Sequence, residues 1–319
     1  MKKFLLNFSI LIALLFSSIE ILNFLYVKTN YWKANNVNEL LKFEDIPDSI
    51  SLANVGSSHG IASFDYINVP YQGFNFGLSS QCYLYDYLVL KQYINQFSKN
   101  AVLLIPISYF QITRIKTDFK DQRARYYRFL KKEYMDIYSV REKILFSFLP
   151  VLTAGDTFRF IYRDIDIPPR SKFMTEPELI KYCTEKYRSW TTDDEHGHVF
   201  EAGEEGFVRN KFLISQIVEF CYAKDIQPIL ITTPITSILN DKYAEKSPGF
   251  FDTFYRFTRE LLEAYPNLSY FDYSHDPRFE NDFSLFRDGD HLNIYGAEKF
   301  TAIVISDLQT SGLLSIQLP

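Results

Sequence analysis

Two near-continuous apolar runs, NAVLLIPI at 100–107 and IQPILITTP at 226–234, limit the fold of this chain most strongly. Such runs without polar alternation are typical of strands covered on both faces, as in parallel sheets. Further strands and the helices between them are expected, in chain order, at 49–56, 73–77, 81–97, 207–225, 250–266, 268–274 and 294–309. The alternation of strands and helices predicts a three-layer, doubly wound α/β domain with a parallel sheet.

One long segment interrupts this alternation. Nearly a hundred residues separate Phe110 from Phe207, far more than an ordinary connection in an α/β domain. Its first part is helical in pattern and rich in Arg, Lys and Tyr, and its later part is rich in loop-forming residues. An insertion at the carboxyl end of a strand lies beside the ligand-binding crevice, so we expect residues 111–206 to form a lid or cap. The α/β domain that contains this insertion is expected to cover residues 49–319.

The N-terminus is strongly apolar. Residues 4–27 carry a single charge, that of Glu20, and a helix of about 20 apolar residues crosses a bilayer. Lys2 and Lys3 favour a cytoplasmic N-terminus. We therefore expect residues 1–27 to be an uncleaved signal anchor, joined by a polar stalk at 28–48 to a periplasmic or extracellular domain. A signal peptide cleaved near LFSS is the alternative.

Charge and cysteine content exclude several classes of protein. The net charge of −5 leaves no basic surface of the kind that binds nucleic acid. The three cysteines, Cys82, Cys183 and Cys221, are too few and too scattered for a disulfide framework, and none forms a C-x-x-C metal motif. We expect no cofactor.

Two short motifs together indicate nucleophilic catalysis. NVGSSHG at 54–60 places Ser58 in a glycine-flanked turn after a buried strand, and DGDHLN at 288–293 precedes the last helix. A serine needs a base to act as a nucleophile, and that base is usually oriented by a carboxylate. His291 is the candidate base and Asp288, three residues earlier, the candidate orienting group. Both motifs lie where a doubly wound sheet presents its carboxyl edge, so we predict a Ser-His-Asp triad.

These motifs resemble those of the SGNH (GDSL-like) hydrolase superfamily, whose first block is G-D-S and whose last block is D-x-x-H-x-N. Residues 56–58 match the first block with Ser57 in place of the aspartate, and 288–293 match the last block closely. The resemblance implies a flavodoxin-like sheet order and Ser58 as the nucleophile. It also implies that the N–H groups of Ser58 and Gly77 form the oxyanion hole.

The third block of the family departs from its pattern. The family has G-x-N-D after the third strand, whereas this chain has IPISYF at 105–110, without an asparagine to hold an oxyanion. Loss of such a donor costs about two to three orders of magnitude in rate if nothing replaces it. Ser108 and Tyr109 are candidate substitutes, or the hole depends on Ser58 and Gly77 alone. In lacking this asparagine the chain resembles membrane-anchored branches of the family. These include the D-alanyl-transfer protein of teichoic acid synthesis and proteins of polysaccharide O-acetylation.

Other polar residues of these motifs have supporting or alternative roles. We expect His59 to line the wall of the site, Asp272 to support the catalytic loop indirectly and Asn293 to cap the last helix. Ser57 is a second choice as nucleophile, and Asp290 is an alternative orienting group for the base. His196 and His198 lie in an acidic stretch, but without a placed third ligand they are weak candidates for a zinc site. We expect no metal.

The residues and the resemblance, which covers about 50–110 and 207–310, lead to one functional hypothesis. We predict a membrane-anchored, serine-dependent O-acyltransferase or O-acetyl esterase acting on a cell-envelope or exported polysaccharide. The resemblance to the anchored branches also implies a multi-pass membrane acyltransferase as partner. Because the third block is missing, the alternative is a catalytically inactive glycan-binding or assembly subunit of the same fold.

Overall fold

A computed structural model of the chain describes residues 1–112, 120–153, 157–165, 169, 171–191, 203–247 and 249–315. The chain forms two compact units, one made of residues 1–45 and 118–168 and the other of residues 46–117 and 169–319. The boundary between them runs through the expected insertion at 111–206, because its first part groups with the N-terminus and its last part with the second unit. The role of this insertion as a lid stays a prediction.

The second unit is built on a five-stranded parallel sheet with the order β2-β1-β3-β4-β5. Its strands are β1 (Ile50–Asn54), β2 (Gly73–Asn75), β3 (Phe97–Pro106), β4 (Gln227–Thr232) and β5 (Ser269–Asp272). The predicted α/β fold is confirmed, with the flavodoxin-like strand order. In this order the chain direction across the sheet reverses between β1 and β3, and doubly wound folds bind ligands beyond the carboxyl ends of the strands at that point.

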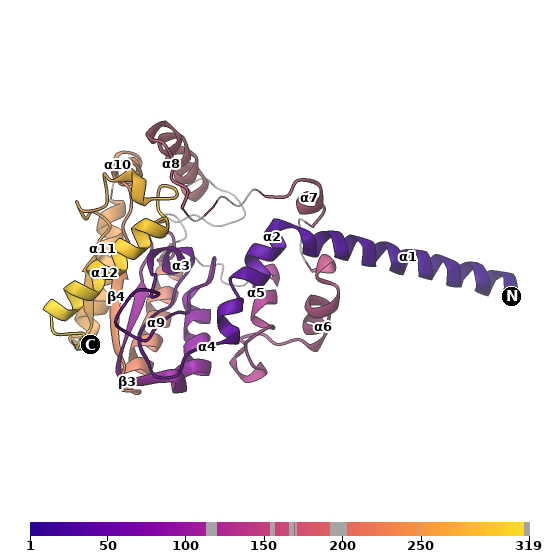
Figure 1. Cartoon of the computed structure of the whole chain (residues 1–319), viewed down its shortest axis with the longest axis horizontal. Helices are drawn as coiled ribbons and strands as arrows, with labels where there is room; N and C mark the ends of the chain where they lie inside the picture. The colour runs from indigo at the N-terminus through magenta and orange to yellow at the C-terminus, as the bar shows by residue number, and fades with distance from the viewer. Residues whose placement is uncertain are drawn as a thin grey trace. The chain divides into compact units, whose positions relative to one another are not determined.

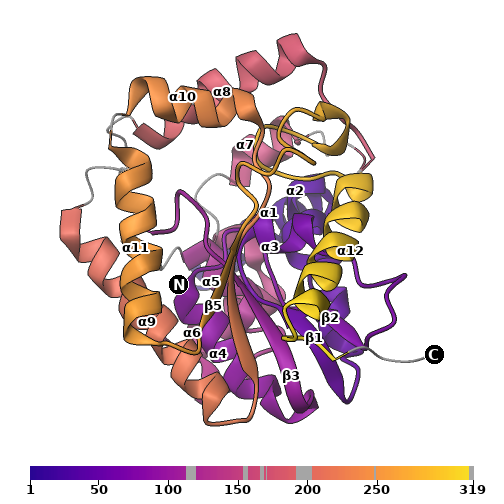
Figure 2. The same cartoon turned by 90° about the vertical axis from the view of Figure 1, so that its left-hand side faces the viewer.

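Helices cover both faces of the sheet. The helices of this unit are α3 (Ser58–Ser63), α4 (Tyr83–Tyr93), α8 (Glu176–Thr191), α9 (Gly203–Tyr222), α10 (Ser237–Lys246), α11 (Phe250–Ala264) and α12 (Ile294–Thr310), with short 3-10 helices η3 (Ile94–Gln96) and η6 (Phe283–Leu285). Of these, α8 and α10 lie side by side beyond one end of the sheet (Figure 2). Figure 2 shows α12 on one face and α9 and α11 on the other. The sheet is therefore the middle of three layers, as the continuous apolar strands predicted.

The core lies between the sheet and these helices. On the α12 face, Leu104 of β3 and Ile229 of β4 belong to one buried cluster with Phe300 and Val304 of α12. Complete burial of one such side chain stabilises a fold by about 1.5–3 kcal/mol. This packing fixes the start of α12, and with it the loop that carries Asp288 and His291.

The first unit is helical and begins with one long apolar helix, α1 (Lys2–Lys28). The other elements are α2 (Asn30–Lys33), the π-helix η1 (Ala34–Asn38), η2 (Leu41–Glu44), α5 (Lys120–Tyr126), η4 (Lys132–Tyr134), α6 (Val140–Phe148), η5 (Pro150–Leu152) and α7 (Thr157–Tyr162). By length and composition α1 is long and apolar enough to cross a bilayer, so it is a candidate membrane anchor or signal sequence. Figure 1 shows α6 and α7 beside the C-terminal part of α1.

Candidate active site

The turn between β1 and α3 presents Ser58. Gly56 adopts a φ of +113°, a conformation that favours glycine, and a Cβ there would lie 3.1 Å from Pro106 Cγ. Ser57 is the N-cap residue and Ser58 the first residue of α3. The N–H of a first helical residue has no partner within the helix. This position gives Ser58 a half-buried hydroxyl at the carboxyl edge of the sheet and an N–H free of the helix's own bonding pattern.

The buried carboxyl group of Asp86 stabilises the turn that carries Ser58. The Gly56 N–H donates to Asp86 Oδ1 at 2.8 Å, and Gln81 Nε2 donates to the same oxygen at 2.7 Å. Burial raises the pKa of Asp86 to about 7, even though both hydrogen bonds favour its charged form. Asp86 therefore couples the geometry of the Ser58 turn to a group that can change its charge near neutral pH.

The structure brings Ser58, His291 and Asp288 into one hydrogen-bonded series. Ser58 Oγ lies 2.8 Å from His291 Nε2, and His291 Nδ1 lies 2.8 Å from Asp288 Oδ1. Asp288 Oδ1 also accepts the backbone N–H of His291 at 3.0 Å, which closes the tight turn. The geometry matches the predicted triad, and the catalytic roles of its members stay predictions.

The protonation of His291 follows from its partners. An ionised carboxylate cannot donate, so Nδ1 carries the hydrogen and Nε2 of the neutral ring accepts from the Ser58 hydroxyl. Burial lowers the pKa of His291, but the negative charges of Asp288 and Asp290 outweigh it and hold that pKa above the usual range. The neutral ring of His291 is thus a stronger base than an ordinary imidazole, and the lone pair of its Nε2 points to the hydroxyl of Ser58.

Asn293 secures the start of α12. Its Oδ1 accepts the N–H groups of Tyr295 and Gly296 at 3.1 and 3.0 Å, as expected of an N-cap residue. Its Nδ2 donates to the carbonyl of Ser284 at 2.7 Å. The residue therefore anchors the loop that carries Asp288 and His291 at the N-terminus of α12, and its predicted role as helix cap is confirmed.

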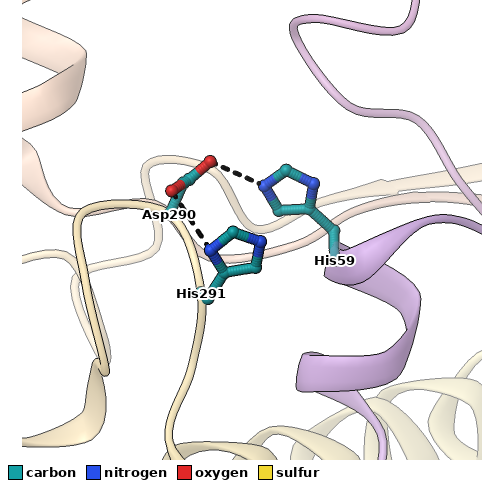
Figure 3. Close-up of side chains that lie close together, drawn as sticks. All are labelled: His59, Asp290 and His291. Atoms are coloured by element: carbon teal, nitrogen blue, oxygen red, sulfur yellow. Dashed lines mark hydrogen bonds and ion pairs between the residues drawn. The ribbon is translucent and has the colours of Figure 1, made fainter. Parts of the chain in front are cut away.

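A second buried network lies directly beside the first. His59 Nε2 is 3.0 Å from Asp290 Oδ2, and Lys186 Nζ of α8 is 3.0 Å from Asp290 Oδ1. Figure 3 shows His59 on α3 and Asp290 with His291 on the loop before α12, with Asp290 in contact with both imidazoles. Asp290 Oδ1 also lies 3.3 Å from His291 Nδ1, slightly farther than Asp288. Asp290 is thus shared by both imidazoles, whereas Asp288 contacts only the imidazole of His291 and also accepts the backbone N–H of Asp290 at 3.2 Å, with Arg287 Nε 3.6 Å from its other oxygen.

Charge balance explains how Asp290 is tolerated in the interior. Burial alone would raise the pKa of Asp290, but the charge of Lys186 and the hydrogen bonds from both histidines hold it well below its usual range. Burial likewise lowers the pKa of Lys186, and the charge of Asp290 more than reverses this. For His59, burial and the nearby His291 lower the pKa. The network therefore contains an ion pair and a neutral His59.

The same cluster has the residue types of a metal site but a charge that opposes one. Ligand atoms of His59, Asp290 and His291 lie within 4.8 Å of one another. However, Asp290 already has the Lys186 ammonium at 3.0 Å, and a divalent cation between the histidines would be repelled by that charge. Both imidazole nitrogens that face the carboxylate also carry hydrogens. These residues do not fit a metal ion in this arrangement.

The candidate oxyanion donors are engaged in other hydrogen bonds. The Gly77 N–H donates to Asn75 Oδ1 at 3.0 Å, and Tyr109 donates through its hydroxyl to Asn240 Oδ1 at 3.0 Å. Since His59 Nε2 donates to Asp290, its Nδ1 accepts from the Ser108 hydroxyl at 3.1 Å. These three groups would have to change partners to hold an oxyanion, so their proposed role stays a prediction.

Some expected residues lie elsewhere. Asp272 ends β5 and its Oδ1 accepts from the N–H and the hydroxyl of Ser274, at 2.9 and 2.7 Å, so these two bonds support the loop after β5. His196 and His198 lie outside the described residues.

The contribution of α8 could not be read from the sequence. Lys186 lies in a helical segment where lysine is ordinary, and nothing in the pattern ties it to Asp290. Cys183 of α8 packs against Gly289, where a Cβ would lie 2.5 Å from the Cys183 Sγ. Helix α8, in the last part of the expected insertion, thus packs on the loop at 288–291 and supplies the cation that pairs with Asp290.

Comparisons with known proteins give only distant similarity. No known protein family matches the sequence, and no curated protein matches it. Among solved structures, the chain is similar to a candidate acylhydrolase from Bacteroides fragilis, with 11% identity, coverage of 88% of this chain and 98% of that chain, and a TM-score of 0.41. It is also similar to a candidate platelet activating factor from Streptococcus pneumonia, with 11% identity, coverage of 96% and 98%, and a TM-score of 0.39. Because both TM-scores lie below 0.5, neither similarity bears on the function of this chain.

Proposed function

We propose that this chain is a serine-dependent acyl-group enzyme of the SGNH type. The observation that carries the proposal is the hydrogen-bonded series from Ser58 through His291 to Asp288. It joins two motifs that are far apart in the sequence, and each contact is within the range of a strong hydrogen bond. A nucleophile, its base and the group that orients the base are the minimum set for acyl transfer through serine.

In the first half-reaction, His291 Nε2 takes the proton of Ser58 while Oγ attacks the carbonyl carbon of an ester. The new C–Oγ bond forms and the carbonyl electron pair moves onto oxygen. When the tetrahedral intermediate collapses, the bond to the leaving alkoxide breaks and His291 returns the proton to it. An acyl ester of Ser58 and a free alcohol result.

In the second half-reaction, His291 activates the group that receives the acyl chain. Attack by water releases a carboxylic acid, and attack by a sugar hydroxyl makes a new ester. We favour transfer to a cell-envelope or exported polysaccharide, with a multi-pass membrane acyltransferase as the source of the acyl group. This choice rests on the resemblance to the anchored branches.

A retained anchor is supported by the packing at the end of α1. Tyr26 is buried, and the side chain of Asn23 donates to the carbonyl of Phe148 and accepts the N–H of Val151, at 3.1 and 3.2 Å. Cleavage near residue 18 would release the membrane-spanning part of a helix whose end belongs to the fold. We propose a single-pass protein with a cytoplasmic N-terminus and its α/β unit outside the membrane.

The engaged state of Gly77 favours the second candidate function, a glycan-binding or assembly subunit without catalytic activity. The Gly77 N–H already has an acceptor in Asn75, so this predicted oxyanion donor would have to change its partner before it could hold an oxyanion. Loss of one such donor costs about 3–4 kcal/mol of transition-state stabilisation. A catalytic role therefore requires substrate to displace Asn75 or Ser108 from its present partner.

A fluorophosphonate probe applied to the full-length protein distinguishes the two candidates. We expect the wild type to be labelled, Ser58→Ala to lose the label, and Ser57→Ala to keep it. Ser57 is a matched control because its hydroxyl is buried and has no hydrogen-bond partner within the described residues. An unlabelled wild type would favour the binding subunit. For a labelled enzyme, the products formed from an acyl ester with and without a sugar acceptor separate transfer from hydrolysis.

A further inference from the structure

Helix α6 of the first unit exposes a stripe of apolar side chains. Val140, Ile144 and Phe148 are 62%, 53% and 71% exposed, although each is large and apolar. At 100° per residue they fall within about 80° of the helix circumference. Arg141 and Lys143 flank the stripe on its two sides and are exposed. This is the pattern of a helix that lies at an interface between apolar and polar surroundings.

The end of the α6 stripe is attached to α1 at the level where a bilayer crossed by α1 would end. The apolar segment of α1 starts at Phe4, and the 20 residues from there to Asn23 span about 30 Å, the thickness of the hydrocarbon core. The side chain of Asn23 bonds to the carbonyl of Phe148 and the N–H of Val151. The C-terminal end of α6 is therefore held at the level where α1 would leave the hydrocarbon.

A second helix of the unit repeats the arrangement. Phe158 and Tyr162 of α7 are 70% and 88% exposed. The ring of Phe160 stacks on Tyr31 with centroids 3.7 Å apart, and Asp164 accepts the backbone N–H groups at the start of α2. Thus α7 is also attached just beyond the apolar part of α1, with aromatic side chains directed to the outside.

We propose, on the basis of the anchoring by α1 proposed above, that the exposed face made up of Val140, Ile144 and Phe148 of α6, together with Phe158 and Tyr162 of α7, binds the surface of the lipid bilayer that α1 crosses. The apolar side chains enter the region between headgroups and acyl chains, and Arg141 and Lys143 extend to the phosphates. Contact with the bilayer would remove these apolar side chains from water, which explains why they are exposed in the isolated chain. The first unit is then a membrane-seated base, which goes beyond a simple anchor followed by a stalk.

The proposal can be tested with the full-length chain in nanodiscs of phosphatidylcholine and phosphatidylglycerol. Cys82, the one cysteine that is not fully buried, is first changed to serine. Single cysteines at Ile144→Cys and Phe148→Cys then carry an environment-sensitive NBD label. Glu133→Cys is the matched control, because this exposed residue follows Phe129, which stacks on Phe43 well beyond α1.

We expect the labels at 144 and 148 to emit at shorter wavelength than the label at 133 and to be quenched by lipids with a nitroxide near the glycerol end of the chain. Aqueous iodide should quench the label at 133 several-fold more strongly than the other two. If all three labels show the same emission and the same access to iodide, the face points to water and the proposal is wrong. Protection of 144 and 148 from both lipid and aqueous quenchers would also contradict it, since a protein contact would then cover the face.

Discussion

The imidazole rings of His59 and His291 stack on each other, with centroids 4.7 Å apart and planes 12° from parallel. Two protonated imidazoles at this distance would repel each other strongly in a buried site. The structure avoids this because the pKa of His59 is lowered, by burial and by the charge of His291, while the pKa of His291 is raised by its two carboxylates despite burial. The pair therefore carries one positive charge at most, on the ring that contacts Ser58.

This asymmetry predicts the pH dependence of esterase activity. Only neutral His291 can accept the serine proton, so kcat/KM should increase as pH rises through the pKa of His291. Because that pKa is raised above 6.5, we expect the midpoint of the acid limb above pH 6.5. A pH series of initial rates with an activated acetate ester measures it. A midpoint at or below pH 6.5 would contradict the assignment of His291 as base.

The two aspartates of the loop should differ in their effects. Asp288 lies 2.8 Å from His291 Nδ1 and Asp290 3.3 Å, so we expect Asp288→Asn to lower kcat by about 10³ and Asp290→Asn to lower it less. Asp290→Asn should instead lower the melting temperature, because it removes the partner of Lys186. Rates and melting curves of both variants test this. The reverse ranking of rates would make Asp290 the orienting group.

Lys186 should act on the active site through charge alone. In Lys186→Met the carboxylate of Asp290 loses its counter-charge, which raises the pKa of His291 further and moves the acid limb to higher pH. Breaking a buried ion pair also costs about 3–5 kcal/mol of stability. Lys186→Arg keeps the charge and should keep the acid limb near its wild-type position. If the limb stays unchanged in Lys186→Met, Lys186 has only a structural role.

Asp86 should make stability depend on pH. Its pKa is about 7 in the folded chain and near 3.8 when unfolded, so the folded state holds the proton more tightly. The stability from this group is fully present below pH 3.8 and is lost as pH rises through about 7. Because a shift of about three pKa units corresponds to about 4 kcal/mol, we expect Asp86→Asn to be more stable than the wild type by up to about that amount at pH 8, and to show little of this gain at pH 4.

Thermal unfolding of the wild type, Asp86→Asn and Asp86→Leu at these two pH values is the measurement. Asp86→Leu also removes the acceptor of the Gly56 N–H, so it should be less stable than Asp86→Asn at both. A constant difference between the wild type and Asp86→Asn across this range would mean that the carboxyl does not titrate there.

Much of the fold was predictable because its signals are local. The continuous apolar strands required cover on both faces, and the 3.6-residue periodicity of 207–225 and 294–309 identified the covering helices. The start of α3 was not predicted. Ser58 was expected in a turn, whereas the structure makes it the first residue of a helix whose N-cap is Ser57. Two further helices of the second unit were missed. Helix α8 lies in the later part of the insertion, whose composition is rich in loop-forming residues, and the apolar residues of α10 are few and lie close to the preceding strand.

The amino-acid sequence alone determined the membrane-spanning length of the N-terminus, the parallel α/β architecture, and the proximity of Ser58, His291 and Asp288. Each depends on short patterns whose outcome follows from strand and helix geometry. Only the tertiary structure decided that Lys186 of α8 neutralises Asp290, that Asn75 occupies the Gly77 N–H, and that α6 and α7 attach at the end of α1. The contacts of Lys186, α6 and α7 join segments that are far apart in the sequence, and the position of a side chain along a helix does not say which distant group it will meet. Asn75 and Gly77 are close in the chain, but which acceptor the N–H of Gly77 takes depends on the side-chain rotamer that the surrounding fold selects.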